Sequence, residues 1–299
     1  MRIRMITLLC TTLLLAACDA GLGITDPQND DSTRLDFKMI KFQQQGGPDC
    51  PELVADMNVK EAGADDQGAA TAENTQNHLC ATVTFSYPQL SSDAKPELAE
   101  KLNRFILQQM VDNPAGSADA TTTPQQLAEA FIDEYRQTPN PFNSWELERN
   151  LKIVFVTQDM LTLLFEEYGY TGGAHPFSGR RYSVLSLKDA SQIILPDLLN
   201  PGYETALNVA AERIFRQVRR LKEEETLEEQ GFSFPNDVFA VNDNFGVLKE
   251  GLDFIFNPYE IAPYALGPTQ FLVPYEDIQE LIRPDGPLGR SANQSREQK

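Results

Sequence analysis

The sequence is poor in the residue types that build most catalytic and metal centres. It has two histidines, four cysteines and one tryptophan among 299 residues. It contains no Cys-x-x-Cys pair, no His-Glu-x-x-His segment and no Gly-x-Ser-x-Gly segment. These absences exclude the common zinc-binding motifs and the nucleophile elbow of the serine hydrolases. We therefore expect no metal ion and no other cofactor.

Positive charge is also scarce. Lysine and arginine number 25 against 44 aspartates and glutamates, which gives a net charge of −19. A surface of this charge repels nucleic acids and attracts basic partners, so we expect no nucleic-acid partner. The alternative, which stays open, is that the acidic surface only keeps a secreted protein soluble.

Long apolar runs are absent except at the N-terminus. Arg2 and Arg4 precede an apolar run over residues 5–17, which is typical of a secretory signal and too short for a membrane span. The segment Leu-Ala-Ala-Cys that ends at Cys18 resembles a bacterial lipobox. Cleavage there would remove residues 1–17, leave a lipidated Cys18 and change the charge from −19 to −21.

We therefore expect a lipoprotein of the bacterial cell envelope that is anchored in a membrane, faces the periplasm and begins with a polar tether over residues 18–34. Several acyl chains on one cysteine would hold it there, because one chain alone binds only marginally. The alternative is an apolar N-terminus in a cytosolic protein. Whether the membrane is the inner or the outer one stays open.

Two cysteines remain once Cys10 is removed and Cys18 is lipidated. Cys50 and Cys80 are then an isolated pair in an oxidising compartment, which predicts one disulfide. The residues between them are polar and rich in alanine and glycine. A bridge across such a segment would mainly restrict the unfolded chain.

The order of secondary structure favours an α+β fold with a mixed, largely antiparallel sheet packed with helices. Alternation of apolar and polar residues predicts strands over residues 35–42 and 79–88, and helical spacing predicts helices over 91–111 and 123–137. In the first of these helices the apolar stripe includes Leu102 and Ile106, and in the second Thr123 is the expected N-cap. Further strands are expected over residues 145–158, 160–170, 180–188, 237–241, 245–249, 252–256 and 269–275, and further helices over 203–230 and 275–282.

One of the two histidines lies in an unusual segment, YTGGAHPF, over residues 170–177. His175 could act as a base, because histidine side chains titrate near neutral pH. No nucleophile or second metal ligand accompanies it in the sequence. We expect a structural His175 whose ring is hydrogen-bonded within the sheet beside a Gly-Gly bend, where Gly172 and Gly173 permit unusual backbone angles.

A second unusual segment, FNPYEIAPYALGP, covers residues 256–268. Its three prolines prevent a long helix or a central strand. Tyr259 and Tyr264 are typical anchors of interfaces, and Glu260 adds a charge that would attract a cation. We count these three residues and His175 as candidate binding residues; the alternative is a packed crossover whose tyrosines face the core.

The segments YTGGAH, YSVLSLKDASQIILPDLL and GLDFIFNPYEIAPYALGPTQFLVPY, in this order, give the chain a resemblance to a known family. It resembles the extracellular domain of unknown function found in the lysozyme-binding anti-sigma factor RsiV. A related two-part arrangement accompanies the deacetylase PdaC. The resemblance implies a smaller N-terminal α+β domain over residues 35–140, which is similar to the PdaC accessory domain, an RsiV-like domain over 141–282 and a flexible tail over 283–299.

The sequence shows neither the cytoplasmic sigma-binding segment and membrane-spanning helix of RsiV nor the catalytic domain of PdaC with its metal-binding histidines. Sigma-factor control is therefore not implied. What the resemblance implies is a non-catalytic domain that binds a lysozyme-like basic protein or peptidoglycan. Two alternatives remain: an enzyme that modifies envelope polysaccharides with His175 and a carboxylate, and a structural protein of the envelope.

Overall fold

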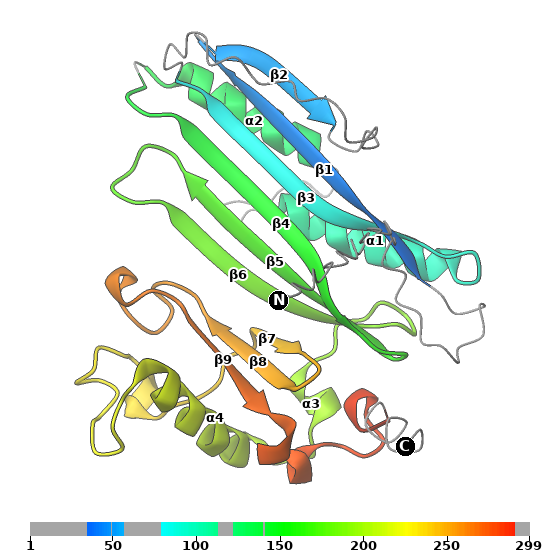
Figure 1. The fold of residues 1–299 in the computed structure, drawn as a ribbon, viewed down its shortest axis with the longest axis vertical. Helices are drawn as coiled ribbons and strands as arrows, with labels where there is room; N and C mark the ends of the chain where they lie inside the picture. Colours follow the sequence, from blue (N-terminus) through cyan, green and yellow to red (C-terminus); the bar gives the residue numbers. More distant parts are fainter. Residues whose placement is uncertain (1–34, 49, 57–78, 113–121, 140, 291–299) are drawn as a thin grey trace, which may run out of the picture.

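A computed structural model describes residues 35–48, 50–56, 79–112, 122–139 and 141–290. The expected α+β class is confirmed: a six-stranded mixed sheet carries helices on one face, and a second sheet has three strands (Figure 1). The six-stranded sheet has the order β2-β1-β3-β4-β5-β6. Its strands are β1 (Asp36–Gly47), β2 (Cys50–Asp56), β3 (Ala81–Ser91), β4 (Trp145–Val156), β5 (Met160–Tyr170) and β6 (Phe177–Ser186).

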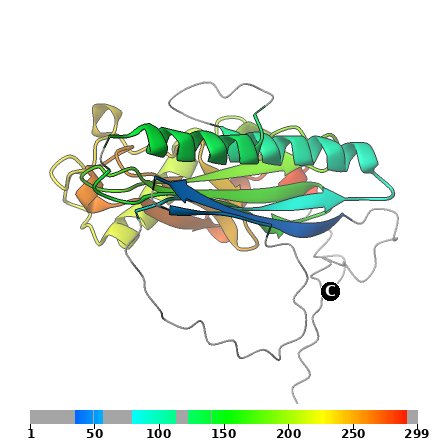
Figure 2. The same ribbon diagram turned by 90° about the horizontal axis from the view of Figure 1, so that it is seen from above.

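All neighbours in this sheet are antiparallel except β3 and β4, which run parallel. A parallel pair needs a long crossover, because the chain must return to the starting end of the sheet. Helices α1 (Pro96–Val111) and α2 (Pro124–Gln137) lie within this crossover. Both helices cover the same face of the sheet (Figure 2).

The first core lies between these two helices and the sheet. The predicted apolar faces are confirmed, since Val83 and Phe85 of β3 and Leu102 and Ile106 of α1 are fully buried. Helix α2 starts with the expected capping box, in which Thr123 and Gln126 each bond to the backbone of the other. Burial of an apolar stripe against the sheet supplies most of the stability of helices this short.

The second sheet has the order β7-β8-β9, and all its pairs are antiparallel. Its strands are β7 (Phe245–Val247), β8 (Gly251–Phe256) and β9 (Thr269–Pro274). It packs with α3 (Leu195–Leu198) and α4 (Glu204–Arg219) around a second core. Phe215 of α4 lies at the centre of this core, in contact with the rings of Phe232, Phe234, Phe239, Phe256 and Phe271.

Three details of the second half differ from the sequence predictions. The helix expected over residues 203–230 ends at Arg219, because Arg220 adopts a left-handed conformation and the chain turns so that Leu227 enters the core. No strand forms over residues 237–241, because Asp237 at the start of this segment and Asn236 just before it both have positive φ angles. The expected last helix is replaced by two 3₁₀ turns, Tyr275–Asp277 and Gln279–Leu281.

The proposed division of the chain at residue 140 falls inside the crossover that joins β3 to β4. The two strands on either side of this point pair with each other, so the larger sheet is continuous across it. Residues 283–290, where the flexible tail was expected to begin, pack against the second core through the buried side chain of Leu288. The backbone N–H of Arg283 also donates to the carbonyl of Leu198.

Candidate binding surface

Two loops that are far apart in the sequence meet beside strand β6. One is the turn between β5 and β6, residues 171–176, where Gly172 has a φ of +83° that an L side chain rarely adopts. The other is the proline-rich loop between β8 and β9, residues 257–268. The two segments that stand out in the sequence therefore form one surface.

The rings of His175, Tyr259 and Tyr264 form what we call the aromatic cluster. The imidazole of His175 stacks on Tyr264 with a centroid distance of 4.2 Å and an interplanar angle of 17°. Tyr259 lies 6.2 Å from His175 and 5.7 Å from Tyr264, measured between centroids. Tyr259 has 64% of its surface exposed and His175 is also exposed, while Tyr264 is half-buried. Neither tyrosine ring is buried in the core, as the alternative of a packed crossover would require.

The contacts of His175 define its neutral tautomer. Its Nδ1 lies 3.0 Å from the backbone carbonyl of Pro176, and a carbonyl only accepts hydrogen bonds. Nδ1 therefore carries the proton in the neutral ring, and Nε2 accepts from the hydroxyl of Tyr259 at 3.1 Å. The histidine joins the two loops, so the expected bond within the sheet is replaced by one to a loop 84 residues away.

Glu260 fastens the proline-rich loop. Its carboxylate accepts from the backbone N–H of Asn257 at 2.8 Å and from the side-chain amide of Asn242. These bonds close a tight turn in which Tyr259 has a φ of +69°, an uncommon angle for a residue with a bulky side chain. The turn thus holds the ring of Tyr259 outward, toward His175.

Asn257 attaches the same loop to β6. Its side-chain oxygen accepts from the backbone N–H of Arg180 at 2.8 Å, and its amide donates to the carbonyl of Arg180 at 3.0 Å. The amide of Asn244 donates to that carbonyl as well. These side-chain amides satisfy the backbone N–H and carbonyl of Arg180 on the outer edge of β6. The loop therefore has a fixed position on the larger sheet.

A buried polar group beneath this loop escaped the sequence analysis. Asp253 of β8 is 4% exposed and accepts from the hydroxyl of Tyr182 at 2.7 Å and from the amide of Gln270. Burial raises the pKa of the Asp253 carboxyl, while the bonds from Gln270 and Tyr182 and the charge of Arg180 oppose the shift. Burial and the bond to Asp253 also raise the pKa of Tyr182. The sequence did contain one sign of this buried group, namely an aspartate inside the otherwise apolar strand segment GLDFIF.

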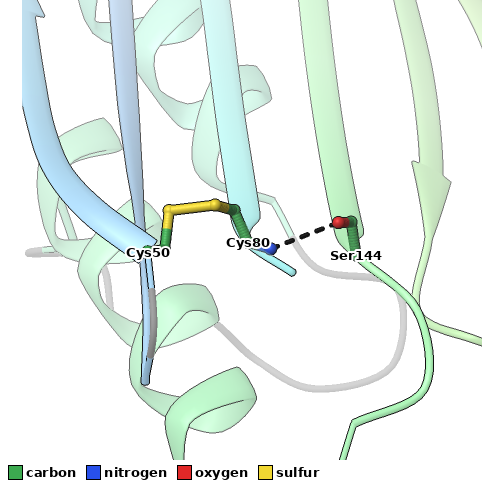
Figure 3. The surroundings of a disulfide bond; sticks show 3 residues. All are labelled: Cys50, Cys80 and Ser144. Atoms are coloured by element: carbon green, nitrogen blue, oxygen red, sulfur yellow. Dashed lines mark hydrogen bonds between the residues drawn. A yellow bond between two sulfur atoms is a disulfide. The ribbon is translucent and has the colours of Figure 1, made fainter. Parts of the chain in front are cut away.

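The predicted disulfide is present. It lies at the same strand ends of the larger sheet as the β5–β6 turn, but toward the opposite, β2 edge. Cys50 at the start of β2 bonds to Cys80 just before β3, with a Cα–Cα distance of 5.4 Å (Figure 3). The backbone N–H of Cys80 also donates to the hydroxyl of Ser144, at 3.2 Å. Cys18 lies outside the described residues, so its lipidation stays a prediction.

Within the described ranges, no group of three or more histidine, cysteine, aspartate or glutamate side chains could hold a metal ion. No ion pair between His175 and a carboxylate is present in the same part of the chain. Among these residues, no helix is both long and apolar enough to cross a membrane.

Two successive segments of the chain match two known protein families. Residues 74–178 match the family described as Deacetylase PdaC, and residues 196–276 match the protein of unknown function DUF3298. A stretch of 39 residues is 49% identical to the immunogenic protein MPT64 of Mycobacterium tuberculosis and to MPB64 of Mycobacterium bovis. That stretch is 13% of this chain and spans only 17% of the length of those relatives.

Two solved structures share the fold. A DUF3298 family member from Bacteroides fragilis superposes with a TM-score of 0.65 at 18% identity, over 89% of this chain and 100% of its own. A DUF3298 family protein from Pseudomonas aeruginosa gives a TM-score of 0.58 at 15% identity, over 85% and 97% of the two chains. The chain thus carries a segment similar to PdaC, followed by a segment similar to DUF3298 proteins of unknown function, and it has the fold of solved DUF3298 proteins.

Proposed function

We propose that the protein is a non-catalytic binding domain of the bacterial cell envelope, tethered through Cys18, whose ligand contacts the aromatic cluster. The observation that carries this proposal is the meeting of His175, Tyr259 and Tyr264 on one exposed surface, although they come from two separate loops. Aromatic rings that are held outward in this way match the anchors that dominate binding energy in many interfaces.

The loops that carry these rings support the same proposal. Glu260 and Asn257 fix the turn by hydrogen bonds, and Pro263 limits the backbone before Tyr264. A surface that is already ordered loses little conformational entropy when a ligand binds. Such rigidity favours a pre-formed contact surface over a loop that serves only as a connection.

The ligand that we expect is a lysozyme-like basic protein or peptidoglycan. The net charge of −19 supports a basic protein, because long-range attraction accelerates its association. Exposed tyrosine rings support either ligand, since they offer an apolar face to a side chain or a sugar ring and a hydroxyl at the rim.

An envelope polysaccharide-modifying enzyme that uses His175 has less support. A general base of this kind is usually oriented by a carboxylate, and the partners of the imidazole here are the Tyr259 hydroxyl and the Pro176 carbonyl. Both contacts help to hold the two loops together. We therefore expect loss of His175 to alter binding and stability, not turnover.

The test uses the purified chain with two ligands. Co-sedimentation with peptidoglycan sacculi and surface plasmon resonance with a c-type lysozyme, each at low and high salt, measure binding. Binding of either ligand that weakens in His175→Ala supports the proposal; Val209→Ser, an exposed change on α4, is the matched control. Release of soluble muropeptides or sugars by the chain, abolished in His175→Ala, would establish the enzyme instead.

A further inference from the structure

A second candidate surface lies on the face of the six-stranded sheet opposite α1 and α2, which is turned toward the viewer in Figure 1. Residues directly opposite each other in neighbouring strands point to the same side of a sheet. The register aligns Thr82 with Glu146 and Glu146 with Tyr170 in one row. The next row contains Gln43, Thr84, Glu148, Tyr168 and Ser178. We call these two rows the polar face.

The two carboxyl groups of the polar face have no cationic partner among the described residues. Glu146 and Glu148 are neighbours on the same side of β4, and within the described part of the chain neither forms an ion pair. The pKa of Glu146 is raised, first by burial, then by the charge of the adjacent Glu148 and by a hydrogen bond between the two carboxyl groups. Repulsion between like charges at this spacing is relieved when a cation binds beside them.

The next row of the same face shows the contrast. Glu166 of β5 pairs there with both Lys152 at 2.6 Å and Arg180 at 3.2 Å. Glu166, which lies on the same face as Glu146 and Glu148, is therefore neutralised by two cationic side chains of the sheet itself. Among the described residues, the two rows that contain Glu146 and Glu148 include no lysine or arginine, so a cation of a ligand can pair with these carboxylates.

The side chains around the two glutamates indicate what kind of cation would fit. Protein interfaces usually centre on apolar side chains, whereas the neighbours of Glu146 and Glu148 carry hydroxyl, amide or phenol groups. Groups on adjacent strands are about 4.8 Å apart, so the polar face offers closely spaced hydrogen-bonding partners on a flat surface. Tyr168 and Tyr170 add ring faces at one side.

We propose that the polar face binds an oligosaccharide with free amino groups, such as a glucosamine polymer without its acetyl groups. The ammonium groups would pair with Glu146 and Glu148, and the sugar hydroxyls with the side chains of Thr82 and Thr84. A sugar ring would lie against Tyr168. The polar face is distinct from the aromatic cluster, so this inference does not depend on the proposed function.

The test titrates the full chain with a glucosamine hexasaccharide and with its fully N-acetylated counterpart, by isothermal calorimetry. The amino form should bind more tightly. In Glu146→Gln/Glu148→Gln, affinity for it should fall by about tenfold or more, as expected for the loss of charge-assisted hydrogen bonds. The matched control, Glu223→Gln/Glu224→Gln, removes the same charge from two exposed residues elsewhere and should bind like the parent.

Circular dichroism of each variant before titration shows whether it is folded. Unchanged affinity of the folded Glu146→Gln/Glu148→Gln variant would overturn the proposal, as would equal binding of the amino and N-acetylated sugars. A lysine pentapeptide is the competing probe. If it binds at the two glutamates and the amino sugar does not, the surface takes a cationic protein and the inference is wrong.

Discussion

Replacing Tyr182 with phenylalanine tests how the smaller sheet is attached to the larger one. The substitution keeps the ring and deletes the hydroxyl that donates to Asp253 at 2.7 Å. Asp253 is 4% exposed, so water cannot readily replace the lost donor. An unsatisfied buried group of this kind costs about 1–3 kcal/mol, and more when it is charged. We expect Tyr182→Phe to lower the free energy of unfolding by about 2 kcal/mol near neutral pH.

The pH dependence of this loss follows from the direction of the pKa shift. The pKa of Asp253 is raised in the folded protein, so the folded state holds its proton to higher pH than the unfolded state does. The contribution of this group to stability is therefore greatest at low pH and falls as pH rises from the unfolded pKa through the folded one. Losing a donor to the carboxylate raises the folded pKa further, so the loss from Tyr182→Phe should shrink on acidification.

Urea unfolding of the parent and the variant at about pH 7 and about pH 4 measures both effects. Tyr170→Phe is the control, because its hydroxyl only accepts a long bond from Asn143, at 3.4 Å, and its loss should have little effect. A destabilisation under about 0.5 kcal/mol at neutral pH, or one of equal size at both pH values, would refute the assigned role of Asp253.

Three further predictions concern stability and anchoring. Reducing or mutating the disulfide between Cys50 and Cys80 should lower the free energy of unfolding by about 3.6 kcal/mol, the chain-entropy value for the loop it closes; peptide mapping that finds both thiols free in envelope-derived protein would contradict the pairing. Arg149→Met should cost about 3–5 kcal/mol in a urea melt, because Glu167 then remains partly buried without its cation, and adding Glu167→Leu should restore much of the loss. Globomycin should cause a larger precursor to accumulate if Cys18 is lipidated, and unchanged migration on a gel would count against the anchor.

Most of the first half of the fold was predictable because its signals are local, but no strand was predicted where β2 lies. Alternation along β3 and the capping box at Thr123 each depend on a few neighbouring residues, and both are confirmed. In the second half, single backbone angles decide where elements end. The left-handed Arg220 stops α4 inside a segment whose composition would suit a longer helix.

The candidate site was predictable only in its parts. The Gly-Gly-Ala-His turn and the tyrosine-proline loop are unusual enough to be noticed separately. Their contact depends on how the smaller sheet packs on the larger one, through buried groups such as Tyr182 and Asp253. Nothing in local composition or periodicity specifies a bond between His175 and Tyr259, which are 84 residues apart.

The dissociation rate of Tyr264→Ala tests the central claim most directly. Tyr264 stacks on His175 and is half-buried, so the variant is first melted to show that the domain stays folded. Surface plasmon resonance then compares it with the parent on immobilised lysozyme or peptidoglycan fragments, whichever binds the parent. We predict a dissociation rate at least about tenfold faster, the change expected for an interface anchor worth about 1.4 kcal/mol or more. A folded variant that dissociates at the parental rate would contradict the assignment of the aromatic cluster as the binding surface.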